Sequence, residues 1–137
     1  QDDKALVFEG YDTLKDTLTM TLELLSNLKT SKERMYKMAN EGFTTATDFA
    51  DYLVKEKNLT FRESYSISSL LVNFAEKKDK HLNQISLDEL KKFYKDLDKS
   101  VLKIFDVKNS MNSKNSYGGT SSNNVKKMIQ KYKRNSQ

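Results

Sequence analysis

The 137-residue sequence contains no cysteine, no proline and only four glycines. Without cysteine the chain has neither a disulfide framework nor a thiolate metal site, which is compatible with a cytoplasmic location. A β-sandwich needs many turn residues, so the scarcity of proline and glycine argues against that class. No apolar run approaches the roughly 18 residues of a membrane span, and we expect no membrane partner. The abundance of Lys, Leu, Glu and Ser instead predicts an all-α protein.

Positive charge is concentrated at one end of the sequence. Residues 1–98 carry 15 Lys or Arg and 18 Asp or Glu, whereas residues 99–137 carry nine basic residues and one acidic residue, Asp106. The net charge of +5 is therefore a property of the C-terminus. A basic C-terminal helix could bind nucleic acid or an acidic partner. Aromatic residues for base stacking do not alternate with its charges, so a solvated helix face is favoured.

The longest predicted helix covers residues 4–28. Along it, residues recur in alternating steps of four and three, and all but one are apolar: Val7, Tyr11, Leu14, Leu18, Thr21, Leu25 and Leu28. This heptad spacing is typical of a seam between helices. Phe8, Leu22 and Leu24 lie off the seam, so we expect helices of a larger parent protein or of other subunits to surround this one.

Capping boxes of the form Ser/Thr-x-x-Glu/Asp predict where four shorter helices begin. The boxes are Thr30 with Glu33, Thr45 with Asp48, Thr60 with Glu63, and Ser86 with Glu89. The first three of these helices are expected to end near Asn40, Lys57 and Lys78. Two further helices are predicted at 99–105 and 122–133, and the Asn-, Ser- and Gly-rich stretch 106–124 is predicted to be a long loop.

Apolar spacing also predicts which helix faces are buried. The helix 60–78 carries two apolar stripes, which predicts burial on two sides and places it at the centre of a small helical unit. The stripes are Phe61, Tyr65, Ser68, Val72 and Ala75, and Ile67, Leu70, Leu71 and Phe74. Other residues expected to face inward are Met35, Met38, Ala39, Ala46, Phe49, Ala50, Leu53, Val54, Leu87, Leu90, Phe93 and Tyr94.

Residue types and spacing alone do not indicate an enzyme. His81 is the only histidine, and its charged surroundings favour an exposed linker residue. No spacing of His, Cys or carboxylates predicts a metal site. The pair Gly118-Gly119 favours a plain turn over a phosphate-binding loop.

Six stretches of the sequence occur in the order of a known family: 1–4, 11–14, 42–54, 60–63, 87–90 and 112–120. The most specific are the run Ala-Thr-Asp-x-Ala-Asp-Tyr-Leu-Val at 46–54 and Ser-Tyr-Gly-Gly-Thr at 116–120. Together they resemble argininosuccinate lyase, a member of the fumarase/aspartase superfamily. Another lyase of that superfamily, such as adenylosuccinate lyase, matches the stretch 116–120 less well. A stand-alone helical module that binds nucleic acid or an acidic partner through its basic C-terminus is the alternative outside the superfamily.

The resemblance implies that the chain is only the C-terminal portion of such an enzyme. Residues 1–28 would be the C-terminal end of the central helix-bundle domain, its last helix, and residues 29–137 would form the small α-helical C-terminal domain. The family splits argininosuccinate into arginine and fumarate by β-elimination, without a cofactor, in sites where three subunits of a homotetramer meet. Its catalytic histidine and serine lie in a Thr-x-x-His stretch and a Gly-Ser-Ser-x-Met-Pro loop. Neither motif occurs here, so no catalytic residue is assigned and the chain alone is expected to be inactive.

Two substrate-binding residues carry over from the family run Tyr-x-x-Asp-x-Gln-x-Asp-Lys. Gln1 matches its glutamine and Lys4 its lysine. The ammonium of Lys4 could pair with a carboxylate of the succinyl group, and the Gln1 amide could donate and accept hydrogen bonds. The sequence departs from the family at Ala5, where Glu often follows, and at Gly10, an unusual residue within a helix. Without the motif, Lys4 would be predicted to be an ordinary surface lysine.

Overall fold

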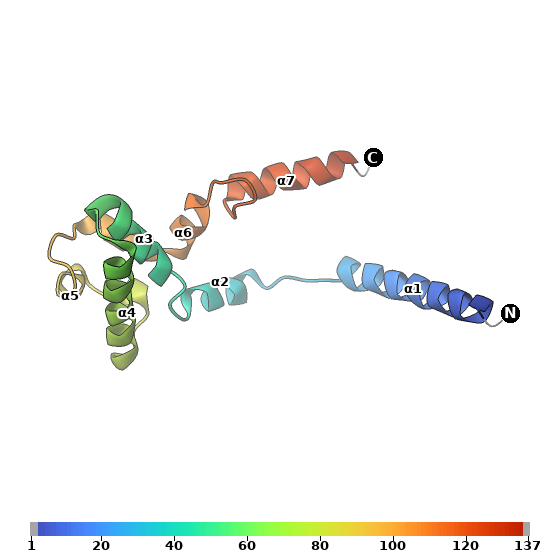
Figure 1. Cartoon of the computed structure of the whole chain (residues 1–137), viewed down its shortest axis with the longest axis horizontal. Helices are drawn as coiled ribbons and strands as arrows, with labels where there is room; N and C mark the ends of the chain where they lie inside the picture. The colour runs from blue at the N-terminus through green and yellow to red at the C-terminus, as the bar shows by residue number, and fades with distance from the viewer. Residues whose placement is uncertain (1–2, 136–137) are drawn as a thin grey trace. The chain divides into compact units, whose positions relative to one another are not determined.

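The computed structural model describes residues 3–135, and every regular element in that range is helical (Figure 1). The α-helices are α1 (Asp3–Ser26), α2 (Lys32–Asn40), α3 (Ala46–Lys57), α4 (Phe61–Lys77), α5 (Leu87–Leu90), α6 (Val107–Ser113) and α7 (Ser122–Asn135). Two 3₁₀ helices complete the set, η1 (Leu82–Gln84) and η2 (Lys99–Phe105). The predicted all-α class is confirmed.

The chain divides into two compact units, residues 1–35 and 36–137. The sequence places a domain boundary between residues 28 and 29. The observed units meet seven residues later, inside α2. That residues 1–28 and 29–137 belong to two different domains of a larger enzyme stays a prediction.

The first unit consists mainly of α1, whose ends lie within two residues of those predicted. Twenty-four residues at about 1.5 Å each give a helix roughly 36 Å long. No residue of α1 is buried. Its one polar seam residue, Thr21, donates its hydroxyl to the Thr17 carbonyl at 2.7 Å. Because this donor is satisfied within the helix, Thr21 could be covered by another helix at little cost.

The second unit has its own hydrophobic core, built where α3 packs against α4 and η2. Phe49 of α3 and Phe105 of η2 are almost fully buried, and their ring centroids lie 5.5 Å apart. The other buried members of this core are Leu53, Leu71, Ala75, Leu82, Ile85, Leu90, Leu97 and Val101. The predicted burial of Phe49, Ala50 and Leu53 on α3 and of Leu90 on α5 is thus confirmed.

Two of the four predicted capping boxes form. Thr60 accepts from the Glu63 backbone N–H at 3.3 Å, and the Glu63 carboxylate accepts from the Thr60 N–H at 3.0 Å. Ser86 and Glu89 make the same reciprocal pair at 3.3 and 3.1 Å. Each box satisfies two backbone donors that the first turn of a helix leaves unpaired.

The other two boxes were wrong. Thr45 directly precedes α3, but its ψ of 4° is not the extended conformation of a capping residue, and its side chain makes no capping hydrogen bond. The helix α2 begins at Lys32, so Thr30 lies one residue too early to cap it.

Each of the two predicted stripes of α4 is buried only in part. The buried residues of α4, namely Ser64, Ser68, Leu71 and Ala75, form a single face. Phe61, Tyr65 and Leu70 remain about 60% exposed. On α2, Met35, Met38 and Ala39 are exposed rather than inward. These apolar residues have no neighbouring helix within the described part of the chain to cover them.

The predicted long loop 106–124 contains a helix. Asp106 caps α6 by accepting from the backbone N–H groups of Lys108 at 2.7 Å and Asn109 at 3.3 Å. The remaining segment, 114–121, includes a tight turn at Gly118, whose φ is +77°. The N–H of Gly119 donates to the Ser116 carbonyl at 2.8 Å and closes this turn. The prediction that Gly118 and Gly119 form a plain turn is confirmed.

Candidate functional site

The two substrate-binding residues implied by the resemblance lie at the start of the chain. Gln1 is outside the described residues. Lys4 is in the first turn of α1, is exposed, and has no ion pair within residues 3–135. A lysine at this end of a helix gains nothing from the helix dipole, whereas a bound anion would be stabilised by both the dipole and the ammonium. Its position therefore allows Lys4 to bind an anionic ligand.

The apolar side chains along α1 are exposed to solvent, as are the residues of its first turn. The seam residues Tyr11, Leu14, Leu18 and Leu25 are each about 60% exposed. A continuous apolar line of this length on one helix is characteristic of a surface that other helices cover. The predicted seam is therefore present on α1, and residues 3–135 leave it exposed.

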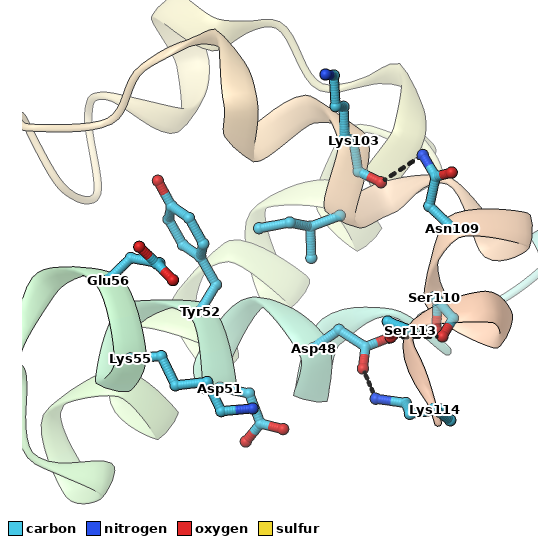
Figure 2. A pocket seen from close by; sticks show the side chains of 11 residues that line it. Asp48, Asp51, Tyr52, Lys55, Glu56, Lys103, Asn109, Ser110, Ser113 and Lys114 are labelled. Atoms are coloured by element: carbon cyan, nitrogen blue, oxygen red, sulfur yellow. Dashed lines mark hydrogen bonds and ion pairs between the residues drawn. The ribbon is translucent and has the colours of Figure 1, made fainter. Parts of the chain in front are cut away.

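The second unit contains a pocket of about 370 Å³ between α3, η2 and α6 (Figure 2). Its lining mixes acidic residues with lysines, and includes Asp48, Asp51, Tyr52, Lys55, Glu56, Lys103 and Lys114. The volume is within the range of small-molecule sites. The lining contains no histidine, so the pocket holds no serine–histidine pair.

Asp48 links three elements at the edge of this pocket (Figure 2). Its carboxylate accepts a hydrogen bond from the Ser110 hydroxyl and forms an ion pair with the Lys114 ammonium. The Asp48 side chain is only 13% exposed. The sequence assigned Asp48 to a capping box on α3, but it instead connects α3 to α6 and to the start of the turn 114–121.

Replacing Asp48 by asparagine should destabilise the second unit by about 1–2 kcal/mol, because it removes a charge-assisted contact at a mostly covered position. The loss of stability is limited because the Lys114 side chain is 45% exposed, and water weakens an ion pair at an exposed position. Urea unfolding followed by circular dichroism would measure it. Asp51→Asn is the matched control, since Asp51 is an exposed aspartate on the same helix. Equal stabilities of the two variants would show that the Asp48 contacts contribute nothing.

Hydrogen bonds join the two ends of the turn 114–121 and connect the turn to α7. The Ser121 N–H donates to the Lys114 carbonyl at 3.2 Å, and the Asn124 amide donates to the Ser116 carbonyl at 2.7 Å. An added Cβ at Gly119 would lie 2.2 Å from the Lys114 carbonyl oxygen. This close approach explains physically why the second glycine of the Ser-Tyr-Gly-Gly-Thr stretch suits this turn.

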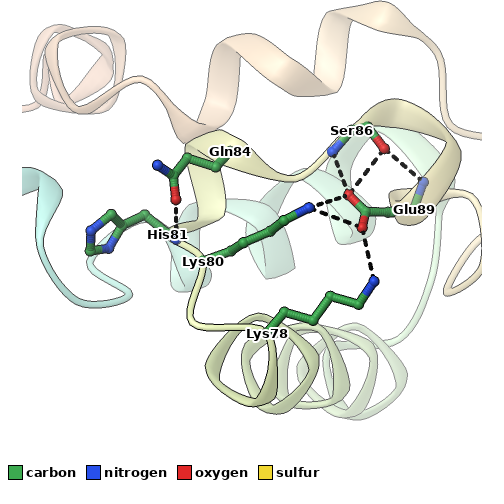
Figure 3. Close-up of polar contacts among 6 residues, drawn as sticks. All are labelled: Lys78, Lys80, His81, Gln84, Ser86 and Glu89. Atoms are coloured by element: carbon green, nitrogen blue, oxygen red, sulfur yellow. Dashed lines mark hydrogen bonds and ion pairs between the residues drawn. The ribbon is translucent and has the colours of Figure 1, made fainter.

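The Glu89 carboxylate has several hydrogen-bond and ion-pair partners, which lower its pKa (Figure 3). The backbone N–H of Ser86, the Lys80 ammonium at 3.2 Å, the Ser86 hydroxyl and the Lys78 ammonium at 3.4 Å all contact its carboxylate. These contacts lower the pKa of Glu89 to about 2, the Ser86 N–H being the largest cause and Lys80 the next. A carboxylate that stays ionised with its oxygens occupied is suited to holding structure, and unsuited to donating a proton.

Glu89→Gln should lower stability at pH 6, and its effect should disappear near pH 2. The folded pKa lies below the unfolded value of about 4.5, so the stabilisation is complete above pH 4.5 and is lost as the pH falls through 2. Urea unfolding of both proteins at several pH values would test this. Glu76→Gln, on the exposed side of α4, should give a difference that is small at every pH. A Glu89→Gln effect that stays constant with pH would contradict the assignment.

His81 is exposed, as predicted, and its backbone N–H donates to the Gln84 side chain at 2.9 Å (Figure 3). Among residues 3–135, no three His, Cys, Asp or Glu side chains are grouped closely enough to hold a metal ion. Searched over the same range, the helices include none that is both long and apolar enough to cross a membrane.

Sequence reasoning missed the contact between Asp48 and Lys114. The two residues are 66 positions apart, and no local pattern predicts such a pairing. The only available signal was that Asp48 and Lys114 each lie within a stretch that resembles the same family, 42–54 and 112–120.

Comparison with known proteins identifies the family. A family model described as argininosuccinate lyase C-terminal matches residues 43–112, the segment from just before α3 into α6. This match covers half of the chain and includes Asp48, Glu89 and the core phenylalanines.

Relatives named argininosuccinate lyase match almost the whole sequence. The protein from Pelagibacter ubique is 52% identical over 98% of this chain and 29% of its own length. Those from a Nitratiruptor species and from Nitrosomonas europaea are each 39% identical, over 98% and 94% of this chain and 29% and 28% of their own lengths. The chain thus spans less than a third of these relatives. It belongs to the argininosuccinate lyase C-terminal family.

Proposed function

We propose that this chain is the C-terminal part of an argininosuccinate lyase, which splits argininosuccinate into arginine and fumarate by β-elimination. The observation that carries the proposal is the 52% identity, over 98% of this chain, to a protein of that name. Nothing in the comparisons favours the alternative of a nucleic-acid-binding module. The proposal places the enzyme in the cytoplasm, in arginine biosynthesis, and without a cofactor.

In this proposal α1 is the last helix of the central bundle, and the segment from residue 29 onward is the small helical domain. The bundle helices of four subunits would cover the apolar seam of α1. The exposure of Tyr11, Leu14, Leu18 and Leu25 supports this role, because helices of a tetramer core need such a surface.

The part of the chemistry that falls to this chain is substrate binding. The Lys4 ammonium would pair with a carboxylate of the succinyl group, with Gln1 beside it. A positive charge there would hold the substrate and orient it for elimination. The catalytic histidine and serine would come from segments that precede residue 1 in the parent and from other subunits.

Self-association of the 137-residue chain should depend on the seam. Leu18→Lys places a charge at its centre and should weaken the association at least about 10-fold, the equivalent of losing one buried leucine. Sedimentation velocity over a concentration series would measure this. Thr13→Lys, which adds the same charge to α1 off the seam, is the control. A monomeric unmutated chain would mean that other segments of the parent cover the seam.

Reading the coding region upstream of Gln1 tests the proposal. We expect an open frame that encodes a Thr-x-x-His stretch and a Gly-Ser-Ser-x-Met-Pro loop. A start codon immediately before Gln1 would instead favour a stand-alone module.

The purified chain should release no arginine from argininosuccinate above a no-protein control, and release by the chain alone would contradict the assignment of roles.

A further inference from the structure

The pocket between α3, η2 and α6 has walls that are fixed to one another (Figure 2). The Ser110 hydroxyl donates to the Asp48 carboxylate, which joins α6 to α3. The Asn109 amide donates to the Lys103 carbonyl at 3.2 Å, which joins α6 to η2. The hydrophobic core connects α3 and η2 directly. The pocket of about 370 Å³ is therefore formed without a ligand, as small-molecule sites usually are.

Tyr52 of α3 and Ile104 of η2 supply apolar surface to this pocket. Both are half-buried and pack against the hydrophobic core. Their contacts with the core restrict how far they can move, so two walls of the pocket keep an apolar surface. A hydrocarbon chain bound between them would be removed from water, which is favourable. The apolar lining thus favours a ligand with a hydrocarbon part.

Charges of both signs line the pocket in equal number. They are three carboxylates and three ammonium groups, those of Asp48, Asp51, Glu56, Lys55, Lys103 and Lys114. Four of them have a counterpart nearby, since Asp48 forms an ion pair with Lys114 and Asp51 lies one helical turn from Lys55 on α3. The charges that remain are those of Glu56 and Lys103.

Glu56 and Lys103 come from opposite walls of the pocket, α3 and η2 (Figure 2). Both are exposed, and neither forms an ion pair within residues 3–135. The acid nearest to Lys103 in sequence, Asp106, already accepts from two backbone N–H groups at the start of α6. Because a lysine side chain rotates about its four-carbon stem, the Lys103 ammonium can turn towards a bound anion. One ligand with an ammonium and a carboxylate group would satisfy both residues.

We propose that this pocket binds a free α-amino acid with a hydrocarbon side chain. The ligand's ammonium pairs with Glu56, its carboxylate pairs with Lys103, and its side chain lies between Tyr52 and Ile104. A ligand with a single charge leaves either Glu56 or Lys103 without a partner. All of these contacts belong to the second unit, so the inference is independent of the proposed enzymatic function and of Lys4.

Three compounds with the same hydrocarbon part test the proposal: L-leucine, 4-methylpentanoate and 3-methylbutylamine. The 137-residue chain is titrated with each, and binding is followed by the backbone NMR signals of Tyr52 and Ile104. L-leucine should bind at least about 10-fold more tightly than either analogue, because only leucine pairs with both charges. Equal binding of the three compounds would overturn the proposal, as would the absence of any shift of these signals with leucine at about 10 mM, where even a weak site is occupied.

Neutral variants of the two charged residues test the orientation of the ligand. Glu56→Gln and Lys103→Gln should each weaken leucine binding about 10-fold. Glu56→Gln should weaken binding of 3-methylbutylamine alone among the analogues, and Lys103→Gln that of 4-methylpentanoate alone. Glu76→Gln and Lys77→Gln make the same charge changes at exposed positions of α4 outside the lining and should leave all affinities unchanged. Equal responses of both analogues to both pocket variants, or equal effects of the α4 variants, would overturn the proposal.

Discussion

Phe49→Ala should destabilise the second unit by about 3–5 kcal/mol, the largest effect of any substitution considered. Phe49 is fully buried, and its ring contacts that of Phe105 at a centroid distance of 5.5 Å. Truncation removes the apolar surface that joins α3 to η2 and leaves a cavity between them. Single domains have net stabilities of only about 5–15 kcal/mol, so the variant should be close to unfolded at moderate temperature.

Urea unfolding followed by circular dichroism would measure this loss. Phe61→Ala is the matched control, because Phe61 is the same residue type on a neighbouring helix and is 64% exposed. Its effect should stay within about 1 kcal/mol. If the two variants unfolded at the same urea concentration, Phe49 would not be part of the core.

Lys4→Ala in the full-length parent should lower kcat/KM by about 30-fold to 1000-fold, which corresponds to losing roughly 2–4 kcal/mol of charge-assisted substrate binding. Thermal stability should change little, since Lys4 is exposed and has no ion pair within residues 3–135. A steady-state assay of arginine release would supply the rate constants.

Lys15→Ala provides the control for this substitution. Lys15 is another exposed lysine of α1 and lies outside the matched motif, so its removal should leave turnover unchanged. Near-normal kcat/KM of Lys4→Ala would identify Lys4 as an ordinary surface residue and would mean that the carry-over from the family motif was wrong at this position.

Local patterns predicted those features that depend on neighbouring residues. The heptad spacing in 4–28 located α1, and the spacing of Phe49, Ala50 and Leu53 identified the inner face of α3. The boxes at Thr60 and Ser86 succeeded because both residues have the extended backbone that lets the side chain reach back to the helix.

Features that depend on distant residues were not predictable in this way. Thr45 failed as a capping residue because its own backbone is not extended, and Asp48, its supposed partner, binds Ser110 and Lys114 instead. The helix α6 was missed because Val107–Ser113 is rich in Asn and Ser and has only two large apolar residues. Its one local signal was Asp106, which caps it.

The two apolar stripes of α4 show a different limit of sequence reasoning. Apolar spacing reports which surfaces could be buried, without identifying what buries them. One face of α4 packs in the core, whereas Phe61, Tyr65 and Leu70 are exposed within the described chain. For the same reason the candidate site at Gln1 and Lys4 came from the family resemblance alone, since neither residue has a local pattern that indicates substrate binding.

The most direct test of the account is a chimera with the Pelagibacter ubique relative. Its C-terminal region, the 29% of its length that matches, would be replaced by this chain. We expect the chimera to form arginine from argininosuccinate, whereas the same relative truncated before the replaced region should not. A chimera that is folded and has the oligomeric state of the relative, yet releases no more arginine than the truncated protein, would contradict the proposed function.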